Sequence, residues 1–395
     1  MVSRLLKESM TETTVAGAPT LSILIPLRTD SFDFYRQRLV LRDRLDLTGV
    51  ETIIIDDGSP ADAAKDIELY CRDRDYKYLR IESGDQQFSL ARSRNTGIKA
   101  ATSSWLYMED ADLIYCRRFF QDVVSQLTLL VQTPFNFLSM PAVYLTPGAT
   151  AKVYDAGELD STYRGVINSL LLEDPKGSPT NSVVESFSPA SGVIALSREL
   201  ALSVGGYDEE FSGWGGEDRD FIFRLMCANG KIQLPVNFED TKSWNLNDTL
   251  VYEGWRSLHR LHGEFMARQG FYAVHLHHKQ QAWRGHVSSA RNMKLAAKKA
   301  LKFKPEHLPR NEMFSLRYTV LFDVFRYHDV HGEVVPTDSF VEDLNRANRQ
   351  REQVLGKSQR SFLRKLRKFF VSPEKYFEDS RYGFLRVLAR RICKK

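Results

Sequence analysis

The residues most able to do chemistry lie in the segment GWGGEDRDF, which runs from Gly213 to Phe221. Three glycines, a tryptophan and three carboxylates fall within these nine residues. Glycine lets a backbone come close to a ligand, an aromatic ring offers a flat apolar face, and a carboxylate can act as a general base. A simpler interpretation is the start of a helix, because acids in a first turn interact favourably with the helix dipole. The two interpretations are compatible for Glu217 and Asp218.

A second acidic motif, MEDAD, follows the apolar run SWLY and contains a DxD motif, in which one residue separates Asp110 from Asp112. Two carboxylates with this spacing can share a hard divalent cation that also takes diphosphate oxygens. Taken alone, such a pair is more often a set of solvated loop acids. Its place at the end of a buried strand, where uncompensated charge is costly, favours a cation site.

The third candidate is the run VHLHH, with histidines at 275, 277 and 278. His275 and His278 are three residues apart, whereas the alternation of a strand would place His275 and His277 on one face. Metal ligation and a hydrogen-bonded structural role both remain open from the spacing. Imidazoles combined with one carboxylate would favour Mn²⁺ over Mg²⁺.

Two continuous apolar runs precede these motifs, LSILIPLR at 21–28 and VETIIIDDGSP at 50–60. Each ends in turn residues, and an amphipathic stretch of helical length lies between them at 32–47. The pattern predicts a strand–helix–strand unit with two buried parallel strands. Ligands of open α/β sheets bind beyond the carboxyl ends of the strands, here at Pro26–Arg28 and Asp56–Ser59.

The rest of the chain continues the alternation of strands and helices that is typical of an α/β fold. Helices are expected at 61–74, 88–102, 117–132 and 220–228, strands at 76–83, 104–108, 135–146 and 270–281, and a strand followed by a helix at 191–211. The strand at 270–281 would carry all three histidines. Polar, proline-containing segments between 117 and 180 are interpreted as a mobile insertion.

Several of these stretches resemble a known family. The runs ILIPLR, IIIDDGSP, ARSRNTG and MEDAD are similar to the nucleotide-binding half of family 2 glycosyltransferases, which have the GT-A fold and use nucleotide-diphosphate sugars. The stretch ASGVIALSRELALSVGGYDEEFSGWGGEDRDFIFRL resembles the galactosyltransferase-type region of β-1,4-galactosyltransferases, chondroitin polymerases and bacterial capsule enzymes, and VHLHH fits the HxxH that ends it. The resemblance covers about residues 20 to 285 and implies a Rossmann-like α/β fold.

The resemblance also implies roles for individual residues. Asp218 would be the base that removes the acceptor hydroxyl proton, Glu217 would hydrogen-bond a sugar, and direct attack would invert the anomeric centre. Asp112, His278 and His275 would hold the metal ion, Mn²⁺ or Mg²⁺. The residues placed against the substrates are Pro26, Arg28, Asp56, Asp57, Arg94, Asn95, Asp110, Trp214, Gly215 and Gly216.

Two positions depart from the family pattern. Relatives often have an acid where this chain has Arg219, which bears on the choice of acceptor. His277 is an additional histidine, which leaves the exact histidine ligands open.

These motifs divide the chain into three expected parts. Residues 1–20 are a flexible leader, and residues 21–290 form the GT-A domain. Within that domain, 21–115 would bind the nucleotide sugar, and 185–285 would bind the acceptor and carry out the chemistry. A helical C-terminal region follows at 291–395.

The tail at 357–395 has 13 Lys or Arg residues against three acids, although the net charge of the whole chain is only +5. Its aromatic and leucine residues recur at helical spacing on both sides of Pro373. Such basic amphipathic helices suit an anionic membrane surface. Packing on the catalytic domain with a solvated basic face is the alternative.

The composition, 43% apolar and 27% charged over 395 residues, is typical of a globular protein. No apolar run approaches the roughly 20 residues needed to span a bilayer, and the first residues do not have the pattern of a secretory signal. Four scattered cysteines indicate neither a zinc site nor a disulfide framework. We expect a cytoplasmic protein, peripheral on the inner face of the cytoplasmic membrane.

The leading hypothesis is a metal-dependent inverting glycosyltransferase that moves a hexose or N-acetylhexosamine from a UDP-sugar to a growing capsule or lipopolysaccharide glycan. The acceptor would be an oligosaccharide or a lipid-linked glycan. A nucleotide-sugar nucleotidyltransferase would need a glycine-rich loop after the first strand, and PLRTDSFDF has no glycine. A non-catalytic glycan-binding protein is the other alternative, and nucleic acid is not expected, because the acids at 109–112 and 217–220 would repel phosphate.

Overall fold

The computed structural model describes residues 20–84, 86–130, 137–159, 183–228, 255–268, 270–278 and 286–302. All of them belong to the first of two compact units, which spans residues 1–328. The expected leader, apart from Thr20, and the tail at 357–395 lie outside the described residues.

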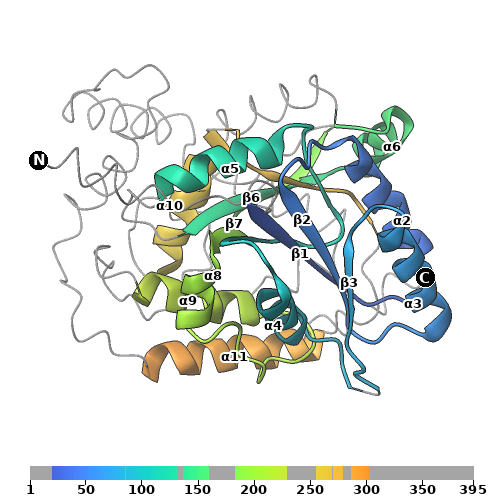
Figure 1. Ribbon diagram of the computed structural model, residues 1–395. Helices are drawn as coiled ribbons and strands as arrows, with labels where there is room; N and C mark the ends of the chain where they lie inside the picture. The colour runs from blue at the N-terminus through green and yellow to red at the C-terminus, as the bar shows by residue number, and fades with distance from the viewer. Residues whose placement is uncertain are drawn as a thin grey trace, which may run out of the picture. The chain divides into compact units, whose positions relative to one another are not determined.

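One mixed eight-stranded sheet forms the centre of this unit (Figure 1). Its parallel half contains, in spatial order, β3 (Lys77–Arg80), β2 (Val50–Asp56), β1 (Leu21–Leu27) and β4 (Trp105–Met108). The predicted strand–helix–strand unit is confirmed, since β1 pairs with β2 in parallel from Leu21 opposite Val50 to Leu27 opposite Asp56. Chain order reverses between β1 and β4, and ligands of such sheets bind where this reversal opens a crevice.

The second half of the sheet brings in distant segments. It contains, continuing outward from β4, β7 (Val184–Ser197), β6 (Phe137–Leu145), β8 (Ala273–His275) and β5 (Leu113–Ile114). Strand β7 is antiparallel to β4 and β6, and β8 is parallel to β6 but antiparallel to β5. This arrangement is the mixed α/β sheet of a GT-A fold. Because β5 begins immediately after Asp112 and pairs Leu113 with His275, the sheet itself brings two motifs together.

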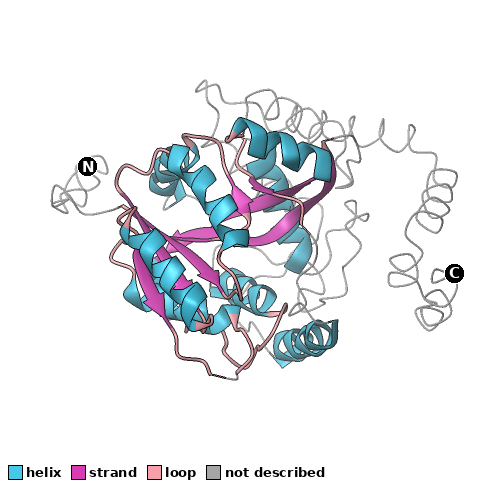
Figure 2. Ribbon diagram, turned by 90° about the vertical axis from the view of Figure 1, so that its right-hand side faces the viewer, coloured by secondary structure: helices cyan, strands magenta, loops and turns pink. Residues whose placement is uncertain are grey.

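Helices lie on both faces of the sheet (Figure 2). They are α2 (Asp33–Leu39) with the 3₁₀ turn η1 (Val40–Arg44), α3 (Ala61–Arg72), α4 (Leu90–Ala100), α5 (Phe119–Leu130), α6 (Pro147–Ala156), α8 (Arg198–Ser203), α9 (Glu217–Ala228), α10 (Trp255–Arg268) and α11 (His286–Lys302). Helix α4 packs on β1 and β2, α10 packs on β6 and β7, and α11 packs on α9. The expected division at residue 290 falls within α11 and stays a prediction.

Helix α6 lies in the stretch from 117 to 180 that the sequence led us to interpret as a mobile insertion. Thr146 caps its start by accepting a hydrogen bond from the Ala149 N–H at 3.3 Å, Pro147 occupies its first turn, and Gly157 ends it at φ 70°. Proline at the start and glycine just past the end are the usual helix signals, so the local sequence did contain them. The structure thus contains a helix that was not among those expected from the sequence, while the mobility of the insertion stays a prediction, and residues 160–182 lie outside the described part.

Helix α10 is not among the helices expected from the sequence. Its buried face includes Trp255, His259, His262 and Met266, at spacings of four, three and four residues. The period is helical, but histidines count as polar in a pattern of apolar residues. The buried His259 has a hydrogen-bond partner, since its Nε2 lies 2.8 Å from the Ser139 hydroxyl on β6. Burial lowers the pKa of His259, which keeps the ring neutral.

Candidate active site

Three side chains at the β5–β8 end of the sheet form a group suited to a metal ion. We call Asp112, His275 and His278 the metal-type group. The Oδ2 atom of Asp112 lies 2.9 Å from Nε2 of His278 and 3.2 Å from Nε2 of His275. One potential ligand atom from each residue lies within 4.8 Å of the others. One carboxylate and two imidazoles are donors that first-row divalent ions such as Mn²⁺ or Zn²⁺ accept. The structure therefore brings together the three residues predicted to bind metal, and their donor set fits such an ion.

The histidine turn differs from the predicted strand. Strand β8 ends at His275, so strand alternation does not govern the two later histidines. The Thr150 hydroxyl on α6 accepts a hydrogen bond from the His277 N–H at 2.8 Å, and this holds the turn against the sheet. The His277 ring pairs with Glu185 at 3.2 Å and lies outside the metal-type group. The spacing of three residues, and not that of two, brings the imidazoles together.

A second group of charges surrounds one buried arginine. Arg94 on α4 is only 1% exposed and donates from Nη2 to Asp110 at 3.1 Å. Its Nη1 donates to Asp218 and lies 3.7 Å from a Glu217 oxygen. The Tyr207 ring packs against this guanidinium at 5.1 Å. Arg94 thus connects the DxD motif of one half of the sequence to the acidic helix start of the other.

The two carboxylates at the start of α9 have different surroundings. The Asp218 side chain is 29% exposed, whereas that of Glu217 is 3% exposed. Burial, reinforced by the charge of Asp218, raises the pKa of Glu217 to about 8, so Glu217 carries a proton at neutral pH. A Cβ on Gly192 of β7 would lie 2.3 Å from the Asp218 carboxylate. Only Asp218 combines an oxygen near solvent with a fixed orientation.

The glycine-rich segment before α9 packs against α11. Gly215 and Gly216 have φ values of 87° and 94°, which glycine adopts readily. A Cβ on Gly216 would lie 2.9 Å from the Asn292 backbone oxygen of α11. The Asn292 side chain donates to the Ser212 and Trp214 carbonyls at 3.0 and 3.4 Å. The close backbone approach expected for a sugar is, at Gly216, an approach to helix α11.

The two acids at the end of β2, Asp56 and Asp57, are buried within the protein. Asp57 accepts hydrogen bonds from the Ser89 N–H at 2.8 Å and from the Arg92 guanidinium through both of its oxygens. Asp56 is likewise fully buried, and it accepts the Tyr78 hydroxyl at 2.8 Å. These bonds fix the β2 turn. Because Arg92 bonds to both oxygens of Asp57, a nucleoside that contacts Asp57 would share this carboxylate with Arg92.

The remaining predicted substrate residues lie around the same edge. Pro26 is a buried residue of β1, and Arg28 donates to the Gln86 carbonyl at 2.7 Å. Asn95 exchanges two hydrogen bonds with the Tyr207 backbone, at 2.7 and 2.8 Å. This pairing makes Asn95 a support for the turn that leads to the glycine-rich segment.

A buried ion pair at Glu109, the residue before the DxD motif, was not expected from the sequence. Arg42 of η1 donates to Glu109, and both side chains are 1% exposed. Burial raises the pKa of Glu109 to about 7, although the Arg42 charge opposes the shift. The burial of Arg42 was not predictable locally, because an amphipathic helical pattern such as that at 32–47 assigns its arginines to the solvent-exposed face.

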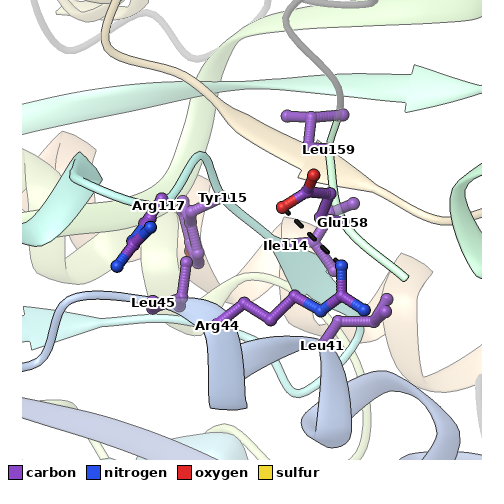
Figure 3. Close-up of a pocket in the computed structure, with 8 residues that line it drawn as sticks. All are labelled: Leu41, Arg44, Leu45, Ile114, Tyr115, Arg117, Glu158 and Leu159. Atoms are coloured by element: carbon purple, nitrogen blue, oxygen red, sulfur yellow. Dashed lines mark ion pairs between the residues drawn. The ribbon is translucent and has the colours of Figure 1, made fainter. Parts of the chain in front are cut away.

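A separate pocket of about 220 Å³ is lined by residues that include Leu41 and Arg44 of η1 and Ile114 of β5 (Figure 3). An ion pair of 3.7 Å between Arg44 and Glu158 crosses it. Its lining residues are Leu41, Arg44, Leu45, Ile114, Tyr115, Arg117, Glu158 and Leu159. None of the predicted site residues is among them.

The family model described as glycosyltransferase like family 2 matches residues 22–303. The chain belongs to this family. The match spans both halves of the sheet and includes Asp112, His275 and His278, so this glycosyltransferase has its metal-type group inside the family domain. Family membership does not favour a nucleotidyltransferase or a binding protein without activity.

Curated relatives of this glycosyltransferase match about half of the chain. The chondroitin synthase of Pasteurella multocida strain Pm70 is 28% identical over 195 residues, or 45% of this chain and 20% of the relative. The hyaluronan synthase of Pasteurella multocida is 25% identical over 201 residues, or 45% and 19%. N-acetylgalactosaminyltransferase 6 of Drosophila melanogaster is 25% identical over 227 residues, or 55% and 33%. The matches cover a third or less of each relative.

Solved structures also resemble the chain. The mannosyltransferase PcManGT from Pyrobaculum calidifontis, in complex with GDP-Man and Mn²⁺, has a TM-score of 0.44 at 13% identity and covers 94% of this chain and 86% of its own. Glucosyl-3-phosphoglycerate synthase from Mycobacterium tuberculosis, with Mn²⁺ and UDP-glucose, has a TM-score of 0.33 at 18% identity, covering 55% of this chain and 68% of its own.

Within the described ranges, no helix has the length and apolar character required to cross a bilayer.

Proposed function

We propose that this glycosyltransferase is metal-dependent and inverting, and that it transfers a hexose or N-acetylhexosamine from a UDP-sugar to a growing capsule or lipopolysaccharide glycan. The observation that carries the proposal is the position of the DxD motif between two groups of side chains. Asp112 contacts the two histidines, while Asp110 reaches Arg94 and, through it, Asp218. A metal-bound leaving group and a base would therefore lie on either side of one short loop.

In this proposal the metal would be held by Asp112, His275 and His278, and it would neutralise charge on the departing diphosphate. Asp218 takes the proton of the acceptor hydroxyl, whose oxygen forms the new bond to the anomeric carbon. The bond from that carbon to the diphosphate breaks, and UDP leaves with the electron pair. Attack from the face opposite the leaving group inverts the centre. Arg94 orients the Asp218 carboxylate through its hydrogen bond.

The protonated state of Glu217 gives it a different role from Asp218 in the proposal. A neutral carboxyl group donates a hydrogen bond, whereas an ionised one only accepts. The Glu217 carboxyl group is buried, and one of its oxygens lies 3.7 Å from Nη1 of Arg94, the atom that bonds to Asp218. Replacement by glutamine preserves a donor, so Glu217→Gln is expected to retain most activity.

The names of the relatives support a sugar-polymer product. Two of them are a chondroitin synthase and a hyaluronan synthase, and a third is an N-acetylgalactosaminyltransferase. An oligosaccharide or lipid-linked glycan is the corresponding acceptor in our proposal.

A cytoplasmic location at the inner membrane face would follow if the basic tail binds anionic lipid. Flotation with anionic liposomes, before and after deletion of residues 358–395, tests that part, and equal flotation of both forms would contradict it.

The proposed chemistry is tested by release of UDP from a panel of UDP-sugars with acceptor glycans. We expect one donor to be turned over with Mn²⁺ and turnover to cease with a chelator. Asp112→Ala should reduce the rate by at least about 100-fold, because a removed ligand weakens both metal and diphosphate binding. Turnover that is unaffected by the chelator would contradict the metal-dependent mechanism.

A further inference from the structure

Arg38 is a buried cation next to the metal-type group. It belongs to α2, is 4% exposed, and donates from Nη1 to the Phe34 carbonyl at 2.7 Å. Its Nε atom is buried without a hydrogen-bond partner, and within the described part of the chain the guanidinium forms no ion pair. Burying a charge without a carboxylate partner is costly. A cation kept in such a place calls for an explanation beyond packing.

Aromatic rings connect Arg38 to the metal-type histidine. Its guanidinium carbon lies 3.7 Å from the centre of the Phe34 ring, and that ring meets His278 edge to face at 5.1 Å. The Tyr154 ring of α6 lies 6.0 Å away on another side. The charge of Arg38 is therefore one aromatic ring away from a metal-type ligand and does not bond to it.

Arg38 also lies within electrostatic range of Asp112. Burial lowers the pKa of Arg38, while the Tyr154 hydroxyl and the Asp112 carboxylate act to raise it. A fixed positive charge at this range repels a bare divalent cation and attracts the diphosphate of a nucleotide. Its effects on the two ligands therefore have opposite signs.

We propose that Arg38 couples metal and nucleotide binding: it weakens the binding of Mn²⁺ alone and strengthens the binding of UDP together with Mn²⁺. The inference rests on the proposed function, because it takes a nucleotide diphosphate as the ligand. Its consequence is that the ion is held chiefly when the nucleotide is present. Arg38 acts through its charge and is a positioning residue, not a catalytic one.

A purely structural role would give a different result. Suppose that Arg38 only supported Phe34 and that Phe34 only held the His278 ring. Loss of either side chain would then weaken the binding of Mn²⁺ and also the binding of UDP with Mn²⁺. Residues behind metal ligands commonly change metal affinity by 10- to 100-fold in that direction. The sign of the change in Mn²⁺ affinity separates the two roles.

The experiment is calorimetry on the full chain with two titrants, Mn²⁺ alone and UDP in saturating Mn²⁺. Arg38→Met removes the charge but keeps an unbranched apolar stem against Phe34. We expect it to bind Mn²⁺ about three- to tenfold more tightly and UDP about three- to tenfold more weakly. Arg38→Lys should stay within about twofold of wild type, and Phe34→Leu should bind Mn²⁺ more weakly.

Affinities that fall together in Arg38→Met, or that do not change, would overturn the inference. Arg38→Gln removes the same charge and provides the measurement if the methionine variant does not fold. Failure of the proposed function looks different, because the wild type itself would then bind no UDP in the presence of Mn²⁺. That result would remove both proposals, whereas normal wild-type binding with unchanged variants removes only this one.

Discussion

Arg94 shows how a single side chain can organise charges that the sequence separates by more than 100 residues. It forms hydrogen bonds to Asp110 and Asp218 while remaining buried. A buried arginine bonded to carboxylates is costly to disrupt, because removal of one partner leaves the others uncompensated. Glu217 is the more buried of the two carboxylates beside Arg94, and this burial, together with the charge of Asp218, raises its pKa.

The raised pKa of Glu217 predicts a pH-dependent stability. A glutamate in an unfolded chain has a pKa of about 4.3, whereas Glu217 in the folded protein has a pKa of about 8. The folded state therefore binds the proton more tightly, and this stabilising contribution is present below pH 4.3 and is lost as the pH rises through 8. Glu217→Gln cannot titrate and should lose less stability over this interval.

Urea unfolding between pH 5.5 and 8.5 measures the effect. We expect the unfolding free energy of Glu217→Gln, relative to wild type, to increase with pH by about 3 kcal/mol over this range. Glu199→Gln, at an exposed position in α8, is the matched control and should show no such increase. A constant difference between Glu217→Gln and wild type would contradict the raised pKa.

At the scale of elements, two helices fix the loops of the site from outside the sheet. Helix α6 holds the histidine turn through the hydrogen bond to Thr150, and α11 holds the glycine-rich segment through Asn292. Both act on backbone groups. The position of a catalytic loop therefore depends on packing between helices and not only on the residues of the loop.

The contact between Gly216 and α11 predicts an unusual cost for an added methyl group. Gly216→Ala would combine a strained φ of 94° with a Cβ 2.9 Å from the Asn292 backbone, which cannot move as a side chain can. Gly205→Ala is a matched control, because its φ is 82° and nothing lies within 4 Å of the added Cβ.

We expect Gly205→Ala to cost about 1 kcal/mol through backbone strain and Gly216→Ala to cost about 2 kcal/mol more. Urea unfolding gives both values, and UDP release should fall only in the Gly216 variant because α9 begins at the next residue. Equal destabilisation by the two substitutions would show that contact with α11 has no effect.

At the scale of the molecule, strands β1, β2 and β4 of the parallel half were predictable because they are largely apolar and mostly buried. In the second half, β6 and β8 lie within predicted strands and β7 overlaps one. Strand β5 has only two residues, too few for a pattern, and the pairing of β8 with β5 and β6 is a long-range contact that the sequence did not predict. The association of Asp112 with the histidines was expected from the resemblance to a family. Arg94, Thr150 and Asn292 were not given these supporting roles, because each acts across a long-range contact that no local periodicity reports.

The central claim is that the metal-type group and Asp218 divide the work between binding and proton transfer. Mn²⁺-dependent UDP binding, compared between Asp112→Ala and Asp218→Asn and set beside their turnover of the preferred donor, tests it most directly. We predict that Asp112→Ala loses binding and turnover together. Asp218→Asn should bind UDP within about threefold of wild type but turn over at least about 100-fold more slowly, as expected for a lost base. Normal turnover in Asp218→Asn, or normal metal-dependent binding in Asp112→Ala, would contradict the account.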